Sequence, residues 1–175
     1  MVLTLYICRI CGDPYLGASK PTHCPFCGAP FKYIILAKEW VEPVVKLSQE
    51  SANDLVRALE LEIDNTEFYL CASRLKESGF VASQLFRNLA RHESEHMSAI
   101  NKILKLENLP EPPNPGFCHT NLEGNFKEAH MRESRAIKLY SEAAKRANDP
   151  RIKELFTALV EIESEHLKIS ETRPQ

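Results

Sequence analysis

The chain has 175 residues, of which 43% are hydrophobic and 26% are charged, so it can bury a core and is not a disordered protein. Its formal net charge of −2 gives no electrostatic argument for binding nucleic acid. No apolar run is long enough to cross a bilayer, and the first residues lack the basic and apolar regions of a signal peptide. We therefore expect a cytoplasmic protein that binds neither nucleic acid nor membrane.

Residues 1–46, here called the cysteine lobe, are rich in Cys, Gly and Pro, with strand-prone pieces at 3–6 and 33–36. The lobe is too small to fold on apolar burial alone, so we expect a bound metal to stabilise it. Its candidate ligands are two Cys-x-x-Cys pairs, namely Cys8, Cys11, Cys24 and Cys27. Such spacing fits a zinc ribbon as well as an iron site, since both use four thiolates.

After the lobe, apolar residues recur at helical spacing. The predicted helices cover residues 51–77, 81–106, 122–147 and 150–170. Ser78 and Gly79 break the pattern after the first helix, and four prolines place a long connection at 107–121. Two helical hairpins joined by one long crossover describe a ferritin-like four-helix bundle. We thus expect a mainly α protein with two domains, the lobe at 1–46 and the bundle at 47–175.

The two hairpins carry the same residues at nearly the same interval. The repeated residues are Glu62 and Tyr69, Glu93 and His96, Glu133 and Tyr140, and Glu163 and His166, one pair in each helix. Residues three apart lie on one helix face, so each Glu-x-x-His presents a carboxylate and an imidazole in one direction. Four carboxylates and two imidazoles are the ligands of a di-iron or di-manganese centre. We predict that the four glutamates and two histidines are catalytic metal ligands, and that the tyrosines either bond a ligand carboxylate or pack in the core.

A single Glu-x-x-His is usually an ordinary surface pair. Two copies with matched glutamates weaken that alternative, because carboxylates buried without a metal would be very costly. His130 stands one turn before Glu133 and is a candidate seventh ligand or partner of a ligand, or else a histidine with its own hydrogen bonds near the end of the bundle. The other histidines outside the motifs, His23, His92 and His119, are expected to point away as structural or exposed residues.

Two cysteines remain outside the Cys-x-x-Cys pairs. Cys71 falls on the side of its helix opposite Glu62, so we expect a small buried hydrophobe. Cys118 lies in the crossover and has no evident partner.

With these motifs the chain resembles the rubrerythrins over nearly its whole length. Cys8-x-x-Cys11-Gly12 and Cys24-Pro25-x-Cys27 resemble their rubredoxin-like module, and the two Glu-x-x-His helices resemble their di-iron bundle. The cysteine lobe leads, which is similar to the reverse rubrerythrins. One departure is that rubrerythrins commonly carry a further glutamate one turn from the one matched by Glu133, whereas here the flanking residues are Ala129, His130, Ala136 and Ile137. A mechanism in which an iron moves toward that glutamate does not carry over unless His130 replaces it.

The resemblance implies a non-haem di-iron peroxidase that reduces hydrogen peroxide to water in defence against oxidative stress. Electrons would pass through the four-cysteine site, which favours iron there over zinc. An external donor protein would supply them, because the sequence has no Gly-rich dinucleotide fingerprint. Two alternatives remain: a ferritin-like iron oxidase or storage protein, and a zinc-ribbon adaptor with a non-catalytic bundle.

The lengths of the predicted helices bear on electron transfer. Helices of about 25 residues span nearly 40 Å, so a lobe tethered at one end of the bundle need not reach a site in its middle. We therefore expect a homodimer or larger homo-oligomer, in which the cysteine iron of one subunit serves the di-iron site of another.

Overall fold

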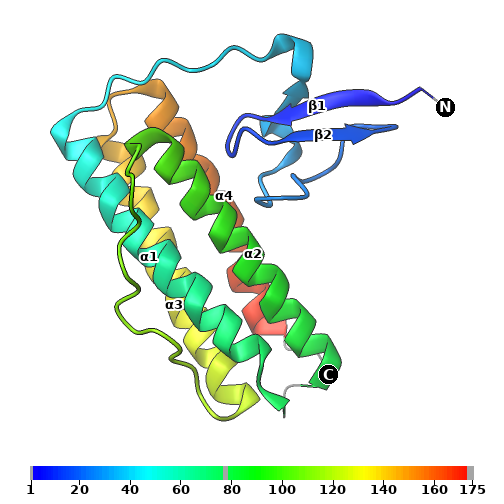
Figure 1. Ribbon diagram of the computed structural model, residues 1–175, viewed down its shortest axis with the longest axis vertical. Helices are drawn as coiled ribbons and strands as arrows, with labels where there is room; N and C mark the ends of the chain where they lie inside the picture. The colour runs from blue at the N-terminus through cyan, green and yellow to red at the C-terminus, as the bar shows by residue number, and fades with distance from the viewer. Residues whose placement is uncertain (1, 77–78, 173–175) are drawn as a thin grey trace.

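A computed structural model describes residues 2–76 and 79–172. Three short strands in the cysteine lobe precede four long helices, and the mainly α architecture confirms the predicted fold class (Figure 1). The predicted end of the first helix at residue 77 and the predicted break at Ser78 lie outside the described residues.

The cysteine lobe is built on an antiparallel sheet in the order β2-β1-β3. Its strands are β1 (Thr4–Cys8), β2 (Pro14–Gly17) and β3 (Ile34–Leu36), and short 3-10 helices at Phe31–Tyr33 and Ala37–Glu39 flank β3. β1 and β3 confirm the two strand-prone pieces. β2 was not predicted, because its four residues are too few to show a period of two.

The bundle consists of α1 (Gln49–Ser73), α2 (Gly79–Leu104), α3 (Leu122–Arg146) and α4 (Pro150–Thr172), which confirm the four predicted helices. Their starts follow from local chemistry. The side chains of Ser48 and Asn121 accept hydrogen bonds from the backbone N–H groups of Ser51 and Gly124, at 3.1 and 2.7 Å, and Pro150 occupies the first position of α4. No helix within the described residues has the length and hydropathy needed to cross a membrane.

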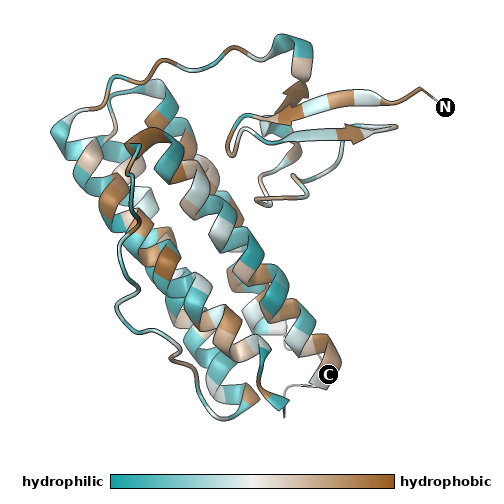
Figure 2. Cartoon of the chain, in the orientation of Figure 1, coloured by the Kyte–Doolittle hydropathy of each residue, from teal (hydrophilic) through white to brown (hydrophobic). Residues whose placement is uncertain are grey.

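The helices pair as two hairpins, and residues 105–121 run outside the bundle from the end of α2 back to the start of α3 (Figure 1). Polar residues cover most of the outward helix surfaces (Figure 2). This arrangement places the middle turns of all four helices around one interior, where the repeated carboxylates and imidazoles lie.

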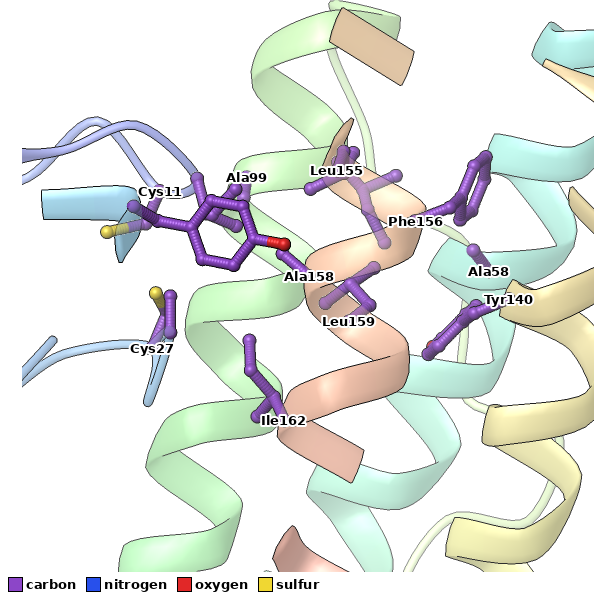
Figure 3. Close-up of a cluster of buried hydrophobic side chains, with 14 of the residues drawn as sticks. Cys11, Cys27, Ala58, Ala99, Tyr140, Leu155, Phe156, Ala158, Leu159 and Ile162 are labelled. Atoms are coloured by element: carbon purple, nitrogen blue, oxygen red, sulfur yellow. The ribbon is translucent and has the colours of Figure 1, made fainter. Parts of the chain in front are cut away.

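The cysteine lobe packs against α2 and α4 and shares one hydrophobic core with the bundle. Cys11 and Cys27 face Ala99 of α2 and Ile162 of α4 (Figure 3). Polar contacts hold the same interface: Arg9 pairs with Glu154 at 2.5 Å, Lys32 pairs with Glu161 at 2.7 Å, and Lys102 donates to the Cys11 carbonyl at 2.6 Å. The lobe therefore lies alongside the helices and not beyond their end. The expectation of electron transfer between subunits assumed a lobe too far from the middle of its own bundle, and that assumption was wrong.

Cys71 and Cys118 form a disulfide with a Cα–Cα distance of 5.7 Å. Both expectations for these residues were wrong, because the crossover runs back along α1 and brings together two cysteines 47 positions apart. Disulfides are rare in reducing compartments, so this bond does not support the expected cytoplasmic location, which stays a prediction.

Candidate metal centres

Two chain reversals in the cysteine lobe present the four cysteines. Each reversal ends in a glycine with positive φ, Gly12 at +80° and Gly28 at +75°, a conformation that side chains other than glycine's disfavour. The N–H groups of these glycines donate to the carbonyls of Cys8 and Cys24, at 2.9 and 3.0 Å. The two Cys-x-x-Cys-Gly segments are therefore matching knuckles, called here the first knuckle (8–12) and the second knuckle (24–28).

The four sulfur atoms are buried and lie within 4.8 Å of one another. Cys8 and Cys27 are 3.7 Å apart between sulfurs, as are Cys11 and Cys24. A tetrahedral site with metal–sulfur bonds of about 2.3 Å has sulfur–sulfur edges of about 3.8 Å. The cluster thus fits one tetrahedral metal ion and is consistent with a rubredoxin-like site.

The thiol chemistry agrees with a bound cation. Hydrogen bonds with the neighbouring thiols, and then burial, raise the pKa of Cys11 far above its usual range. Its hydrogen bond to Cys24 lowers the pKa of that thiol instead. Four buried sulfurs so close together cannot all ionise by themselves, whereas a metal ion would hold them as thiolates.

In the bundle, the structure brings together all six predicted ligands, each fully buried or nearly so. Their ligand atoms form two groups, one of Glu62, Glu93, Glu163 and His96, and one of Glu93, Glu133, Glu163 and His166. Glu93 and Glu163 belong to both groups, so they are placed to bridge two metal ions if the groups hold them. Glu62 and Glu133 each belong to one group and would be terminal ligands.

Both histidines turn Nδ1 toward the carboxylates. His96 Nδ1 lies 3.1 to 3.4 Å from oxygens of Glu163, Glu93 and Glu62. His166 Nδ1 lies 2.8 Å from Glu163 and 3.2 Å from Glu93. Each ring therefore keeps Nε2 for a partner outside the site.

One oxygen of each glutamate in the site has no hydrogen-bond partner among the described residues, although those of Glu93 and Glu163 lie 3.2 and 3.1 Å from a histidine Nδ1. A buried carboxylate oxygen without a hydrogen bond is costly, and four such oxygens in one interior are more so. Two divalent cations would neutralise the four carboxylates and take up these oxygens. The site therefore fits a di-iron centre, as the donor set of oxygen and imidazole ligands also suggests.

Burial, and then the charges of neighbouring carboxylates, raise the pKa of Glu62 and Glu133 well above the usual range. Burial lowers the pKa of His96 and His166, but the carboxylates outweigh it and hold both pKa values well above normal. Without metal, the site consequently holds protons that a metal must displace.

Mn²⁺ binding to the bundle is expected to strengthen as the pH rises from about 6 to about 8, because the raised pKa values keep protons on the ligands throughout this window. The gain should be roughly tenfold per pH unit for each displaced proton. Calorimetric titrations in buffers of different ionisation enthalpy measure both the affinity and the protons released. A pH-independent affinity would contradict the assignment of the protonated histidines.

Two tyrosines hold the terminal glutamates. The hydroxyl of Tyr140 donates to Glu62 at 2.5 Å, and that of Tyr69 donates to Glu133. Each tyrosine thus crosses from its own hairpin to the ligand of the other, which confirms the predicted bond to a ligand carboxylate. Burial and the adjacent carboxylates raise the pKa of both phenols, so they remain donors.

The outer nitrogens of the two histidines have different partners. His96 Nε2 lies 2.9 Å from the backbone carbonyl of Cys27, and His166 Nε2 lies 3.1 Å from Nδ1 of His92. His92 lies outside both groups of ligand atoms, as expected, but it does not point away from the site, because its position on α2 turns it toward α4, where its edge meets the edge of the His166 ring. Burial is the main cause that lowers the pKa of His92 to about 4. No local pattern in the sequence distinguishes His92 from an ordinary polar residue.

His130 lies outside both groups of ligand atoms, which excludes the alternative of a seventh ligand and leaves the other alternative, a histidine near the end of the bundle. Its side chain is 48% exposed, and its Nδ1 is 3.5 Å from Ser170 Oγ and 4.0 Å from Glu171. Ala129, four residues before Glu133, is buried in the core, whereas His130, three residues before it, turns toward the outer end of α4.

Comparison with known proteins agrees with this geometry. The profile of the rubrerythrin family matches residues 53–171, which is more than half of the chain. A bacterioferritin from Rhodobacter capsulatus, described with a metal-free dinuclear site and haem iron, is similar in structure with a TM-score of 0.64 and 26% identity over 73% of this chain and 85% of its own. A bacterioferritin from Mycobacterium tuberculosis shares the fold, with a TM-score of 0.62 and 20% identity over 73% and 86%.

No curated protein sequence matches the chain significantly. The family profile covers the bundle with all six clustered glutamates and histidines. The chain therefore belongs to the rubrerythrin family.

Proposed function

We propose that the protein is a non-haem di-iron peroxidase that reduces hydrogen peroxide to water, with electrons delivered through an iron atom in the four-cysteine site. One observation carries this proposal above all. The hydrogen bond of 2.9 Å from His96 Nε2 to the Cys27 carbonyl joins a candidate ligand of the bundle directly to a candidate ligand of the lobe. Such a contact would give electrons a short path from iron in the lobe to the metal ligands of the bundle, which the proposed reaction requires.

A di-iron centre would supply the two electrons that, with two protons, convert one hydrogen peroxide into two water molecules, and iron in the lobe would restore them singly. Glu93 and Glu163 would bridge the two metals, while His96 and His166 would each anchor one. Tyr69 and Tyr140 would hold the terminal carboxylates in place through their hydroxyl donors. Burial of all these groups strengthens each electrostatic contact within the site.

A ferritin-like iron oxidase is the second candidate. Alanines at 129 and 136 leave no further carboxylate one turn from Glu133, so the donor set is limited to four carboxylates and two imidazoles. The structural similarity to bacterioferritins favours the same candidate. The docked cysteine lobe argues against it, because oxidation and storage of iron need only the bundle.

Metal analysis and anaerobic stopped-flow spectroscopy distinguish these candidates. For a peroxidase we expect iron in both sites, a red Fe(III)–thiolate absorption, and faster oxidation of the reduced protein by peroxide than by dioxygen. Faster oxidation by dioxygen, with iron accumulating beyond the capacity of the two sites, would identify an iron oxidase instead. A colourless protein with zinc alone would identify an adaptor.

Three further features belong to this proposal. Electrons enter from a separate donor protein, because the sequence has no dinucleotide-binding fingerprint. The protein acts in the cytoplasm as part of oxidative stress defence, and it assembles as a homo-oligomer. Transfer between the two metal sites, however, takes place within one chain, through the contact between Cys27 and His96.

Hybrid assemblies test transfer within one chain. When Cys24→Ser subunits are refolded together with Glu93→Ala subunits, we expect no recovery of donor-dependent peroxide reduction, because neither chain has both sites. Restored turnover in preparations shown to contain hybrids would instead establish transfer between subunits.

A further inference from the structure

The second knuckle of the cysteine lobe touches two histidines of α2. The carbonyl oxygen of Cys27 accepts a hydrogen bond from His96 Nε2, and the adjacent Gly28 lies close to the ring of His92. A Cβ atom built on Gly28 would be 3.3 Å from His92 Nδ1 and 3.4 Å from Ile162 Cγ2, so the glycine allows a close approach. His92 belongs to neither group of ligand atoms, yet it lies between the lobe and His166.

In the contact between His92 and His166, the hydrogen-bond donor and acceptor can be assigned. Nδ1 of His166 faces the carboxylates, at 2.8 Å from Glu163, so a metal would bind at Nδ1 and the ring would carry its hydrogen on Nε2. That N–H donates to Nδ1 of His92 at 3.1 Å. The rings are 5.4 Å apart between centroids and inclined by 20°, so they meet edge to edge and nearly coplanar, as a hydrogen bond between two ring nitrogens requires.

A partner on the outer nitrogen fixes the orientation of a ligand imidazole and raises the basicity of its metal-binding nitrogen. His96 receives this support from the Cys27 carbonyl. His166 receives it from the side chain of His92, which in turn packs on Gly28. One knuckle therefore reaches the imidazoles of both metal sites, the first directly and the second through an intervening ring.

We infer that His92 is a positioning residue for His166, and that the cysteine lobe sets the orientation of this imidazole by packing Gly28 against His92. The inference rests on the proposed function only in that the bundle holds two metal ions. It predicts that disturbing the second knuckle weakens metal binding inside the bundle, at the site that contains His166.

The role of His92 is tested by Mn²⁺ calorimetry on the full chain with one equivalent of Zn²⁺ in the cysteine site. In His92→Phe, which keeps a flat ring but lacks the acceptor, one of two Mn²⁺ binding steps should weaken about 10- to 100-fold. His92→Asn should restore much of this loss, because its Oδ1 can occupy the place of Nδ1. The matched control is His130→Phe, which changes a half-exposed histidine outside the site.

Unchanged affinities in His92→Phe, beside a wild type that binds two Mn²⁺ ions, would overturn the inference and leave the proposed function standing. A wild type that binds no Mn²⁺ in the bundle would overturn both.

Gly28→Ala, compared with Gly12→Ala, tests the role of the lobe. Both glycines occupy the same knuckle position with positive φ, but a Cβ at Gly12 would have nothing within 4 Å. The two substitutions thus share their backbone strain, and only Gly28→Ala should weaken the Mn²⁺ step affected by His92→Phe. In the double variant with Gly28→Ala and His92→Phe, the loss of Mn²⁺ affinity should be smaller than the sum of the two single losses, because both substitutions act through one contact. Equal affinities in the two alanine variants, or fully additive losses, would refute the coupling.

Discussion

Glu163→Ala is expected to remove metal from the bundle and to lower peroxide turnover by more than about 100-fold, because Glu163 occupies a position shared by both metal sites. The matched control is Glu165→Ala on the same helix. Glu165 is exposed and contacts His23 of the lobe at 3.3 Å, so its loss should leave metal content and turnover nearly unchanged. Elemental analysis and stopped-flow assays with peroxide measure the two quantities.

The stabilisation gained from metal adds a sharper criterion. In the metal-free protein Glu163 is paired with the two histidines, at 2.8 Å from His166 Nδ1 and 3.1 Å from His96 Nδ1, so its removal leaves buried positive charge without its partner. We therefore expect metal-free Glu163→Ala to unfold at a lower temperature than the metal-free wild type, and the further stabilisation that the wild type gains from metal to be lost. A variant that kept two metal ions and normal turnover would refute the assigned site.

The bundle and its inward residues could be predicted from the sequence because both depend on local spacing. Helical periodicity set the four helices to within a few residues, and the repeat of Glu-x-x-His placed one carboxylate and one imidazole on a single face. The internal repeat then related Glu62 to Glu133. Each of these predictions used residues within a few helical turns of one another, and the helices of the structure keep these residues on the faces that the spacing predicts.

The features that were missed depend on contacts between distant segments. Nothing around His92 or Gly28 in the sequence indicates that they meet, since their contact exists only after the lobe has docked on α2 and α4. The docking of the lobe was not predicted, because the sequence shows only at which end of the bundle the lobe is attached. It does not show which helix surface the lobe covers. The pairing of Cys71 with Cys118 had an available signal: two cysteines left over after the metal knuckles, one of them in a crossover long enough to return along the first helix.

Cys71→Ser is expected to lower the free energy of unfolding of the oxidised protein by about 4 kcal/mol, because the disulfide closes a loop of 47 positions in the unfolded chain. For a chain of this size, such a loss corresponds to a fall of roughly 10 °C in melting temperature. Thermal and denaturant unfolding, measured with and without a reductant that leaves the metal sites intact, give both values.

The remaining variants show whether the disulfide itself causes the effect. Cys118 packs at the edge of the hydrophobic cluster that contains Tyr69, so the bond fixes the crossover over the residues that support the Glu133 side of the bundle. Cys118→Ser and the double variant should therefore match Cys71→Ser, since each removes the same bond, and the reduced wild type should approach all three. If reduction left the wild type as stable as before while Cys71→Ser still lost about 4 kcal/mol, the loss would come from packing of the Cys71 side chain rather than from the cross-link.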